Sequence, residues 1–369
     1  MASHAVFAEE VETTNTLDGV SKSLGLDAYI EEINGCIKDL DIDSINIDNL
    51  SKELLSGKGI GFNNLLTNIV SILLREVFSS IKGAVFIFFI VIIMAILSAI
   101  SLDKKSEITN IVYLVCFIAI ATISITTFKD TIELFTSTTD TLSKLMQIVS
   151  PFVIAILIGT GAITSTGIIQ PMLLFISSLI GFIITYVVVP ILSISVALSV
   201  VSSMSDNLEF SKLSKTFNKA VIWIVGIVLT LFLGILSLET SLTSSIDSLS
   251  VDVTQAAVSN FIPVVGKFFS DSLEAVIGSA KIIGKAGGII GIVTILIVSL
   301  GPVLKILSIF IVYVILSAIC EPICGEKKIT KFLEGFADTY KTILGILIGV
   351  DILFIISTGI IINLCSKIT

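Results

Sequence analysis

The chain contains repeated runs of apolar residues, each close to the length that an α-helix needs to cross a lipid bilayer. A crossing takes about 20 residues, and the clearest runs cover residues 83–102, 108–128, 145–163, 217–238 and 341–363. Inside lipid every backbone N–H and C=O must be bonded within the protein, which leaves helices and closed barrels. The alternating ten-residue pattern of a barrel is missing. The sequence therefore predicts an all-α polytopic integral membrane protein.

Two longer apolar regions hold a proline near their middle. Residues 168–205 contain Pro190, and residues 286–324 contain Gly301-Pro302. Because proline lacks a backbone donor and tends to break a helix, we expect two helices in each region, or one crossing and a re-entrant piece in the first. The total is then about seven to nine transmembrane helices, in a membrane domain that covers residues 83–369.

The formal net charge of −8 lies in an acidic N-terminal arm, residues 1–61. Residues 9–58 hold 12 acidic and 4 basic residues, and the rest of the chain is balanced. Such an arm gives no support for binding nucleic acid or anionic lipid. Within it Leu26–Ile37 has helical spacing. Residues 62–82 predict an amphipathic helix that lies on the membrane surface and leads to the first crossing.

The first eight residues have one feature of a secretory signal. Val6-Phe7-Ala8 before Glu9 has the small residues of a signal-peptidase site, but the charged and long apolar parts upstream are missing. Residues 1–8 are therefore either a remnant of a signal peptide or a leader without regular structure. The first alternative puts the acidic arm outside the cytoplasm.

Lysines indicate which ends of the predicted crossings face the cytoplasm. The lysine-rich connections are residues 103–105, 212–219 and 327–331. Residues 239–260 hold no lysine or arginine and should be external. An odd number of crossings must then follow before residue 327, yet residues 286–324 supply two. Either residues 263–285 also cross, or residues 286–324 do not cross twice.

A charged stripe lies between residues 267 and 285. Its members fall in steps of four and three, which puts them on one face of a helix. They are Lys267, Asp271, Glu274, Gly278, Lys281 and Lys285. Charges within membrane segments are costly and usually face a cavity or one another. The stripe therefore either lines an aqueous path, alone or in a ring of subunits, or lies flat in the headgroup layer. In both cases Pro263 and Gly266 provide a break before it.

Two charges stand alone inside apolar runs, Lys305 and Asp351. An ionisable side chain in a membrane segment usually pairs with another or marks an ion pathway. We therefore expect these two residues either to pair with each other or to take part in ion coupling.

Glycines recur at four-residue spacing in two apolar regions. The pairs are Gly284 with Gly288, Gly287 with Gly291, and Gly345 with Gly349. Such small residues let helix backbones approach closely. The contact is either between helices of one chain or between the subunits of a homo-oligomer.

The residues for catalysis and for metal binding are lacking. The only histidine is His4, and Cys320 and Cys324 are spaced as C-x-x-x-C rather than C-x-x-C. No G-x-S-x-G or H-E-x-x-H motif is present, and residues 278–285 have one residue too many for a phosphate-binding loop. We expect no enzymatic activity, no cofactor and no metal site. Energy for any transport would come from an ion gradient or from another protein.

Four segments resemble the stage III sporulation protein AE family, in the same order as in the family. The most specific is Asn260-Phe-Ile-Pro-Val-Val-Gly-Lys-Phe-Phe-Ser-Asp271, which carries Asn260, Pro263 and Gly266. The others are Leu73-Leu-Arg-Glu-Val77, Gln170-Pro-Met-Leu-Leu-Phe175 and Gly301-Pro-Val-Leu-Lys-Ile-Leu307. The resemblance covers about residue 62 to the end.

This resemblance implies an endospore-forming bacterium and the mother-cell membrane around the forespore. It implies a membrane subunit of a channel complex, a secretion-like apparatus called a feeding tube, that joins the two cells. The expected partners are the other proteins of the stage III sporulation A operon, including its ATPase, and indirectly stage II sporulation protein Q. The charged stripe would lie near the conduction path or a subunit contact. Two alternatives stay open: an ion-coupled secondary transporter that uses Asp351 and Lys305, and a scaffold that conducts nothing.

Overall fold

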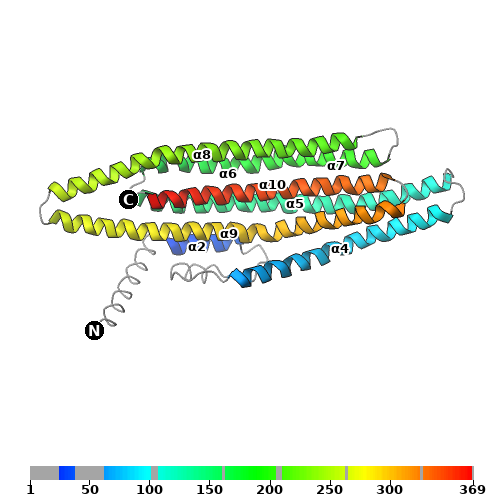
Figure 1. Ribbon diagram of the computed structural model, residues 1–369, viewed down its shortest axis with the longest axis horizontal. Coiled ribbons are helices and arrows are strands. Elements are labelled where there is room, and N and C mark those ends of the chain that lie inside the picture. Colours follow the sequence, from blue (N-terminus) through cyan, green and yellow to red (C-terminus); the bar gives the residue numbers. More distant parts are fainter. Residues whose placement is uncertain are drawn as a thin grey trace.

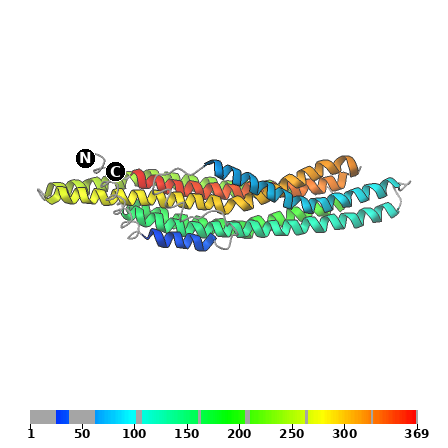
Figure 2. The same cartoon turned by 90° about the horizontal axis from the view of Figure 1, so that it is seen from below.

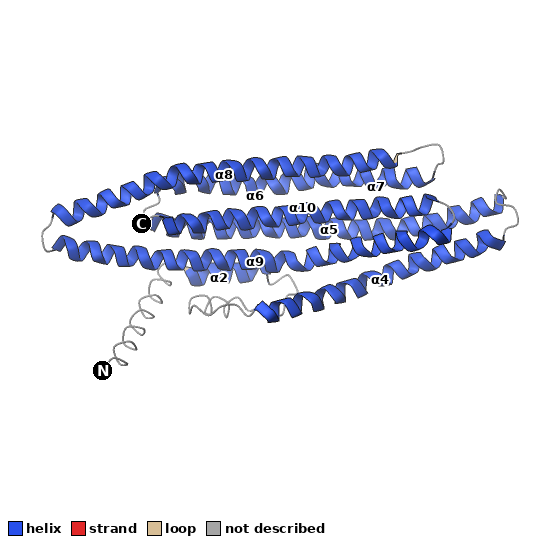
Figure 3. Cartoon of the chain, in the orientation of Figure 1, coloured by secondary structure: helices blue, strands red, loops and turns tan. Residues whose placement is uncertain are grey.

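The computed structural model describes residues 25–37, 62–100, 107–159, 163–204, 210–261, 265–324 and 327–367. Within these residues the regular structure is helical and contains no strand (Figure 3), which confirms the predicted all-α class. The helices are α2 (Leu26–Ile37), α4 (Phe62–Ile100), α5 (Glu107–Gly159), α6 (Ile163–Ile183), the π-helix η1 (Ile184–Val188), α7 (Val189–Met204), α8 (Ser211–Phe261), α9 (Val265–Cys324) and α10 (Lys327–Lys367).

Six helical stretches in the described part of the chain are long and apolar enough to cross a membrane. They are Arg75–Leu97, Ile111–Gly159, Thr166–Met204, Ser211–Leu238, Lys281–Pro322 and Lys328–Leu364. The protein is therefore a multi-pass membrane protein. The number six is below the predicted seven to nine, because helix breaks that the sequence predicts do not occur.

The first of these breaks was expected between residues 129 and 144, where polar residues interrupt the apolar pattern. In the structure this stretch lies inside α5, which continues from Glu107 to Gly159. The hydroxyls of Thr127, Thr131 and Thr139 each donate to the carbonyl oxygen four residues earlier, over 2.7–3.0 Å. Because the helix itself satisfies these hydroxyls, the polar stretch does not end it.

The other breaks were expected at Pro190 and at Gly301-Pro302. The structure instead joins α6 to α7 through η1, whose wider turn comes just before Pro190. A π-turn accommodates an irregularity without ending the helix. Pro302 lies within α9, which continues to Cys324. A single proline removes one backbone bond, whereas a full break inside lipid would leave several groups without partners.

The long helices lie side by side along one axis, and successive helices run in opposite directions (Figures 1 and 2). The transitions from α4 to α5, from α7 to α8 and from α9 to α10 lie at the right of Figure 1. Lysines 212, 215, 328 and 331 begin α8 and α10 at this end. The lysine-rich segments near residues 212 and 327 therefore share one end, as the charge pattern predicts, while residues 103–105 lie outside the described residues.

Helix α9 runs from one end of the molecule to the other only once (Figure 1). Residues 286–324 therefore do not cross twice, which is the second of the two alternatives drawn from the lysine pattern. Residues 265–285 form the first part of the same helix and not a separate crossing. One crossing by α9 gives the odd number that the distribution of lysines requires.

Several helices are longer than a membrane is thick. The apolar stretch of α5 has 49 residues and that of α9 has 42. At about 1.5 Å per residue, 49 residues extend for about 74 Å, more than twice the ~30 Å of the hydrocarbon layer. A large part of these helices therefore lies outside the hydrocarbon or faces something other than lipid.

The core between α5, α9 and α10 is built from aromatic rings. Phe117 and Phe332 meet edge to face with their centroids 5.2 Å apart, and Tyr313 and Tyr340 do so at 5.0 Å. Phe336 lies beside Phe332 and is fully buried. Each such pair contributes about 0.5–1.5 kcal/mol beyond the contribution of the apolar area that it buries. The aromatic rings therefore stabilise the packing of α5, α9 and α10.

The glycines of α9 serve packing within the chain. A Cβ added at Gly287 would lie 2.3 Å from the Phe152 ring of α5, and one at Gly288 would lie 2.3 Å from Cγ1 of Ile362 in α10. These glycines let three helices approach closely. Around Gly345, in contrast, a Cβ would meet nothing within 4 Å.

Helix α2 has the bounds that the helical spacing of the acidic arm predicts, and it packs on the membrane helices. The ring of Tyr29 in α2 stacks on Phe152 with centroids 3.9 Å apart, and the Tyr29 hydroxyl donates to the carbonyl oxygen of Gly287 over 3.0 Å. Burial raises the pKa of this hydroxyl above its usual range. The acidic side chains Glu31 and Glu32 face outward. At least this part of the arm is therefore anchored between α5 and α9.

Helix α4 combines two elements that the sequence separates. Residues 62–82 were predicted to lie on the membrane surface before a crossing that begins at residue 83. In the structure they belong to one helix, Phe62–Ile100, and the apolar stretch begins at Arg75. The amphipathic segment therefore continues directly into the crossing.

Candidate functional site

The charged stripe predicted between residues 267 and 285 lies in the first part of α9. Together with the last part of α8 it extends beyond the other helices at the left of Figure 1. Since α9 continues from Val265 to Cys324, the stripe shares one helix with a membrane crossing. This continuity argues against a separate helix lying flat in the headgroup layer.

The described part of the stripe is small. Lys281 is half-buried and Lys285 is exposed. The side chains of Lys267, Asp271, Glu274 and Asn260 lie outside the described residues, as does Pro263, and Gly266 lies in the first turn of α9. The chain does reverse its direction between Phe261 and Val265, where Pro263 and Gly266 predict a break.

Lys305 and Asp351, both of which the structure describes, do not form the predicted ion pair. Asp351 is only 6% exposed, and the hydroxyl of Ser299 in α9 lies beside its carboxyl group. Its Oδ1 atom has no hydrogen-bond partner. Lys305 is exposed and lines a cavity together with residues of α4 and α5. The two charges therefore belong to different surroundings.

A second polar stripe, which we call the α5 polar face, is present on the exposed side of α5. Its members fall in steps of three and four, so they share one side of the helix, and all are exposed. They are Thr122, Thr126, Lys129, Glu133, Ser137, Asp140, Lys144 and Gln147. At ~1.5 Å per residue this face is about 39 Å long, which is longer than the hydrocarbon layer is thick.

The same side of α5 is apolar before and after the polar face. Val115 and Ile118 precede it and Ile158 follows it, each more than half exposed. Exposed apolar side chains suit lipid, whereas charged ones in a membrane segment need water or a protein partner. The α5 polar face therefore faces something other than hydrocarbon.

Cavities flank α5 on both sides of this face. One, of about 210 Å³, lies between α4, α5 and α9, and Glu76, Asp130 and Lys305 supply its charges. The other is a groove of about 450 Å³ between α5, α6 and η1, with Asp140 and Lys144 on its wall. The first cavity brings together two segments that the sequence singles out, 73–77 through Glu76 and 301–307 through Lys305.

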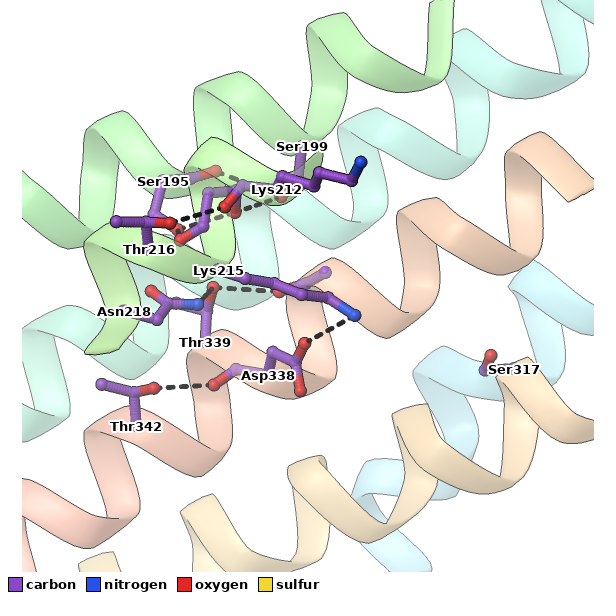
Figure 4. Close-up of polar contacts among 12 residues, drawn as sticks. Ser195, Ser199, Lys212, Lys215, Thr216, Asn218, Ser317, Asp338, Thr339 and Thr342 are labelled. Carbon is purple, nitrogen blue, oxygen red and sulfur yellow. Dashed lines mark hydrogen bonds and ion pairs between the residues drawn. The ribbon is translucent and has the colours of Figure 1, made fainter. Parts of the chain in front are cut away.

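A third polar cluster, which we call the serine seam, is buried where α7, α8 and α10 meet (Figure 4). The hydroxyl of Ser214 lies 2.8 Å from that of Ser195 and 2.9 Å from that of Ser199. Asn218 donates to the hydroxyl of Thr339 over 3.3 Å. The three serine hydroxyls bond to one another, whereas the side-chain oxygen of Asn218 has no hydrogen-bond partner. These bonds join helices, as polar residues between membrane helices do.

At its edge the seam carries one exposed ion pair and one close approach. Nζ of Lys215 lies 3.7 Å from Oδ2 of Asp338 (Figure 4). A Cβ at Gly335 of α10 would lie 2.7 Å from the hydroxyl oxygen of Ser199. The glycine therefore lets α10 approach α7 closely enough for the seam to form.

The α5 polar face is not evident from the apolar runs, because residues 129–144 separate the run 108–128 from the run 145–163. The signal that reveals it is the spacing of polar residues from Thr122 to Gln147, which is helical and continues across residues 129–144. Hydropathy alone does not reveal this face, because a hydropathy profile shows α5 as two apolar runs separated by a polar gap.

The family model of stage III sporulation protein AE matches residues 45–365. The chain belongs to the stage III sporulation protein AE family. The charged stripe, the α5 polar face and the serine seam all lie inside the matched region. Helix α2 precedes it, so the anchored part of the acidic arm lies outside the family match.

A curated member of the family is similar over most of the chain. The match to Stage III sporulation protein AE of Bacillus subtilis (strain 168) is 25% identical over 260 residues, which is 70% of this chain and 65% of that protein. The chain thus matches somewhat less than two thirds of the length of this relative. No solved structure matches the chain.

Proposed function

We propose that this protein is a membrane subunit of the mother-cell-to-forespore channel, the feeding tube, that endospore development requires. Its family membership supports a role in sporulation. The observation that carries the finer proposal is the α5 polar face, since a scaffold bounded only by lipid has no use for exposed charges along a crossing helix. In this proposal the face borders the water-filled path or the subunit that completes it.

The proposal assigns the remaining parts of the apparatus to partners. The subunit resides in the mother-cell membrane around the forespore and takes no enzymatic step of its own. The ATPase and the other proteins of the stage III sporulation A operon supply energy and the remaining wall of the path, and stage II sporulation protein Q is reached through them. The hairpin of α8 and α9, which carries the charged stripe, extends beyond the other helices at the end opposite the lysine-rich one. It is the natural contact for the partners outside the mother-cell cytoplasm, and the ATPase would bind at the lysine-rich end.

The cavity between α4, α5 and α9 favours a second candidate, an ion-coupled secondary transporter. The sequence suggests Asp351 and Lys305 as its coupling charges, but these two residues lie in different surroundings. A transporter would instead use Glu76, Asp130 and Lys305, which line one cavity. A scaffold, the third hypothesis, needs neither the cavity nor the polar face.

The test is to neutralise the polar face without changing its shape. A strain whose own copy carries Glu133→Gln, Asp140→Asn and Lys144→Gln is compared with wild type. We expect arrested forespores and a number of heat-resistant spores near that of a deletion strain, with an unchanged amount of the protein in the membrane. The control is Glu31→Gln with Glu32→Gln, which removes exposed acids of α2.

A second readout separates the channel from the scaffold. Capture of operon partners by the tagged triple variant should equal that of wild type if the face borders a path, because the partners still bind. Normal sporulation of the triple variant would contradict the proposal. Loss of sporulation together with loss of partner capture would mean that the face binds the subunit that completes the path rather than bordering the path itself.

A further inference from the structure

The cavity between α4, α5 and α9 has oxygen atoms of several kinds in its lining, beside apolar side chains. Carboxylates come from Glu76 and Asp130, and hydroxyls come from serines and threonines of α4 and α5, namely Ser79, Ser80, Thr127 and Thr131. The nitrogen of Lys305 is the one charged nitrogen among the lining residues. All three helices belong to candidate membrane crossings. Such a set of hard oxygen donors within a membrane domain suits a hard cation.

A buried hydroxyl in the wall of the cavity has no partner. Tyr313 lines the cavity and is only 3% exposed, and its oxygen makes no hydrogen bond of acceptable geometry. The hydroxyls of Ser124, Thr127 and Tyr340 lie near it, but none of them forms a well-aligned hydrogen bond with it. Buried polar atoms are nearly always satisfied, by protein, water or a bound group. Of these residues Tyr313 and Thr127 line the cavity, so the hydroxyl of Tyr313 is suited to completing a ligand sphere there.

The charges in the cavity do not neutralise one another by direct contact. Lys305 forms no ion pair within 4.0 Å with Glu76 or Asp130, all three of which the structure describes. Among the described residues Glu76 forms an ion pair with Arg75, over 4.0 Å, and the Arg75 side chain is 80% exposed. The lining residues themselves therefore present two carboxylates and one ammonium, and the exposed Arg75 guanidinium beside Glu76 lies outside the lining.

We propose that this cavity binds a partly hydrated alkali cation, Na⁺ or K⁺, with Glu76, Asp130 and the hydroxyl of Tyr313 as the recognising groups. The volume of about 210 Å³ leaves room for the cation and several of its waters. Lys305 is a tethered cation in the same space, so it competes with the bound ion. The proposal goes beyond the channel function and does not depend on it.

Because Lys305 competes with the bound ion, the two kinds of substitution should change the affinity for the cation in opposite directions. Removing a carboxylate must weaken cation binding, whereas removing the ammonium must strengthen it. Each change should be about tenfold in affinity, the size expected for one charge a few ångströms away. A merely structural role of Lys305 would weaken binding or leave it unchanged when the residue is replaced.

The experiment measures equilibrium binding of ²²Na⁺ to the purified full chain in lipid nanodiscs, with KCl, NaCl and choline chloride as competitors. We expect saturable binding that an alkali chloride displaces and choline chloride does not. Glu76→Gln with Asp130→Asn should lower the affinity, Tyr313→Phe should lower it less, and Lys305→Gln should raise it. Competition by KCl against NaCl identifies the preferred ion.

Glu321→Gln, an exposed acid at the end of α9, is the matched control and should bind like wild type. Gel filtration and thermal melting establish that each variant is folded. If the carboxylate variant does not fold, Lys305→Gln still tests the proposal, because only a cation site predicts tighter binding. Absence of saturable binding to wild type, or equal affinities of wild type and Lys305→Gln, would overturn it.

Discussion

Two polar regions lie in the membrane-crossing helices, and they differ in whether their side chains have partners. In the serine seam, Ser195, Ser199 and Ser214 are buried and bond to one another. On the α5 polar face, Asp140 and Lys144 are exposed, and neither forms an ion pair with another described residue. Both regions place polar residues within apolar helices. Only the α5 polar face needs water or another protein to solvate its charges.

This difference shows that polar composition alone does not indicate function in a membrane domain. A polar group that is satisfied inside the protein costs little and holds helices together. A charged group that is exposed and unpaired must meet water or another protein. Each of the following predictions tests one side of this comparison, from the largest effect on stability to the smallest.

The largest loss of stability is expected when the close approach that forms the seam is blocked. Gly335→Val places a side chain where even a Cβ lies 2.7 Å from the Ser199 hydroxyl. Overpacking of this kind costs about 1–3 kcal/mol or more, so the melting temperature in nanodiscs should fall. Gly345→Val, where space is open, is the control on the same helix. Equal melting temperatures of the two variants would show that the close approach of α10 to α7 at Gly335 does not contribute to stability.

A smaller loss is expected when the seam keeps its shape but loses its bonds. Ser214→Ala removes the hydroxyl that lies within 2.9 Å of those of Ser195 and Ser199. Bonds between membrane helices are worth about 0.6–2 kcal/mol, and denaturation should show a loss of this size. Ser178→Ala removes an exposed hydroxyl that bonds within its own helix and should cost much less.

The exposed edge of the seam should contribute little. Lys215 and Asp338 have side chains 55% and 42% exposed, and exposed ion pairs contribute about 0.2–1 kcal/mol, less at high salt. Lys215→Met should therefore lower stability by no more than this, with a difference from wild type that shrinks as NaCl is raised. A loss of stability larger than that of Ser214→Ala would mean that the ion pair between Lys215 and Asp338 stabilises the protein more than the serine hydrogen bonds do.

The smallest effect on stability is expected on the α5 polar face itself. Asp140→Asn and Lys144→Gln remove exposed charges without creating a cavity, and surface changes of this kind stay within about 0.5 kcal/mol. Denaturation midpoints should therefore match wild type while spore formation fails. A clear loss of stability would mean that these charges have a structural role like that of the seam.

Much of the fold follows from the sequence by simple rules. Apolar runs locate the membrane helices, the spacing of Leu26–Ile37 predicts α2 with its observed bounds, and lysines near 212 and 327 lie at one end. These predictions succeed because lipid leaves the backbone almost no choice other than a helix. The count fails because it relies on breaks at polar residues and at Pro190 and Pro302, which long helices tolerate.

The candidate site is less accessible from the sequence. Lys305 stands out as a charge in an apolar run, but its neighbours Glu76 and Asp130 come from helices distant in the chain. Pairing of Lys305 with Asp351, one of the two alternatives that the sequence leaves open, does not occur, because their shared isolation says nothing about which helix faces they occupy; a role in ion coupling stays a prediction. The α5 polar face can be predicted from the sequence if the helix is taken as continuous, because the polar residues from Thr122 to Gln147 keep helical spacing.

If the protein borders a channel path, the α5 polar face does not contact lipid. Spin labels placed by Ser137→Cys and Ile118→Cys, in a chain without its native cysteines, report collisions with oxygen, which concentrates in lipid, and with a nickel chelate, which stays in water. We predict high oxygen accessibility at residue 118 and low oxygen accessibility at residue 137, in membranes that contain the assembled protein. Oxygen accessibility at residue 137 as high as at residue 118 would contradict the account.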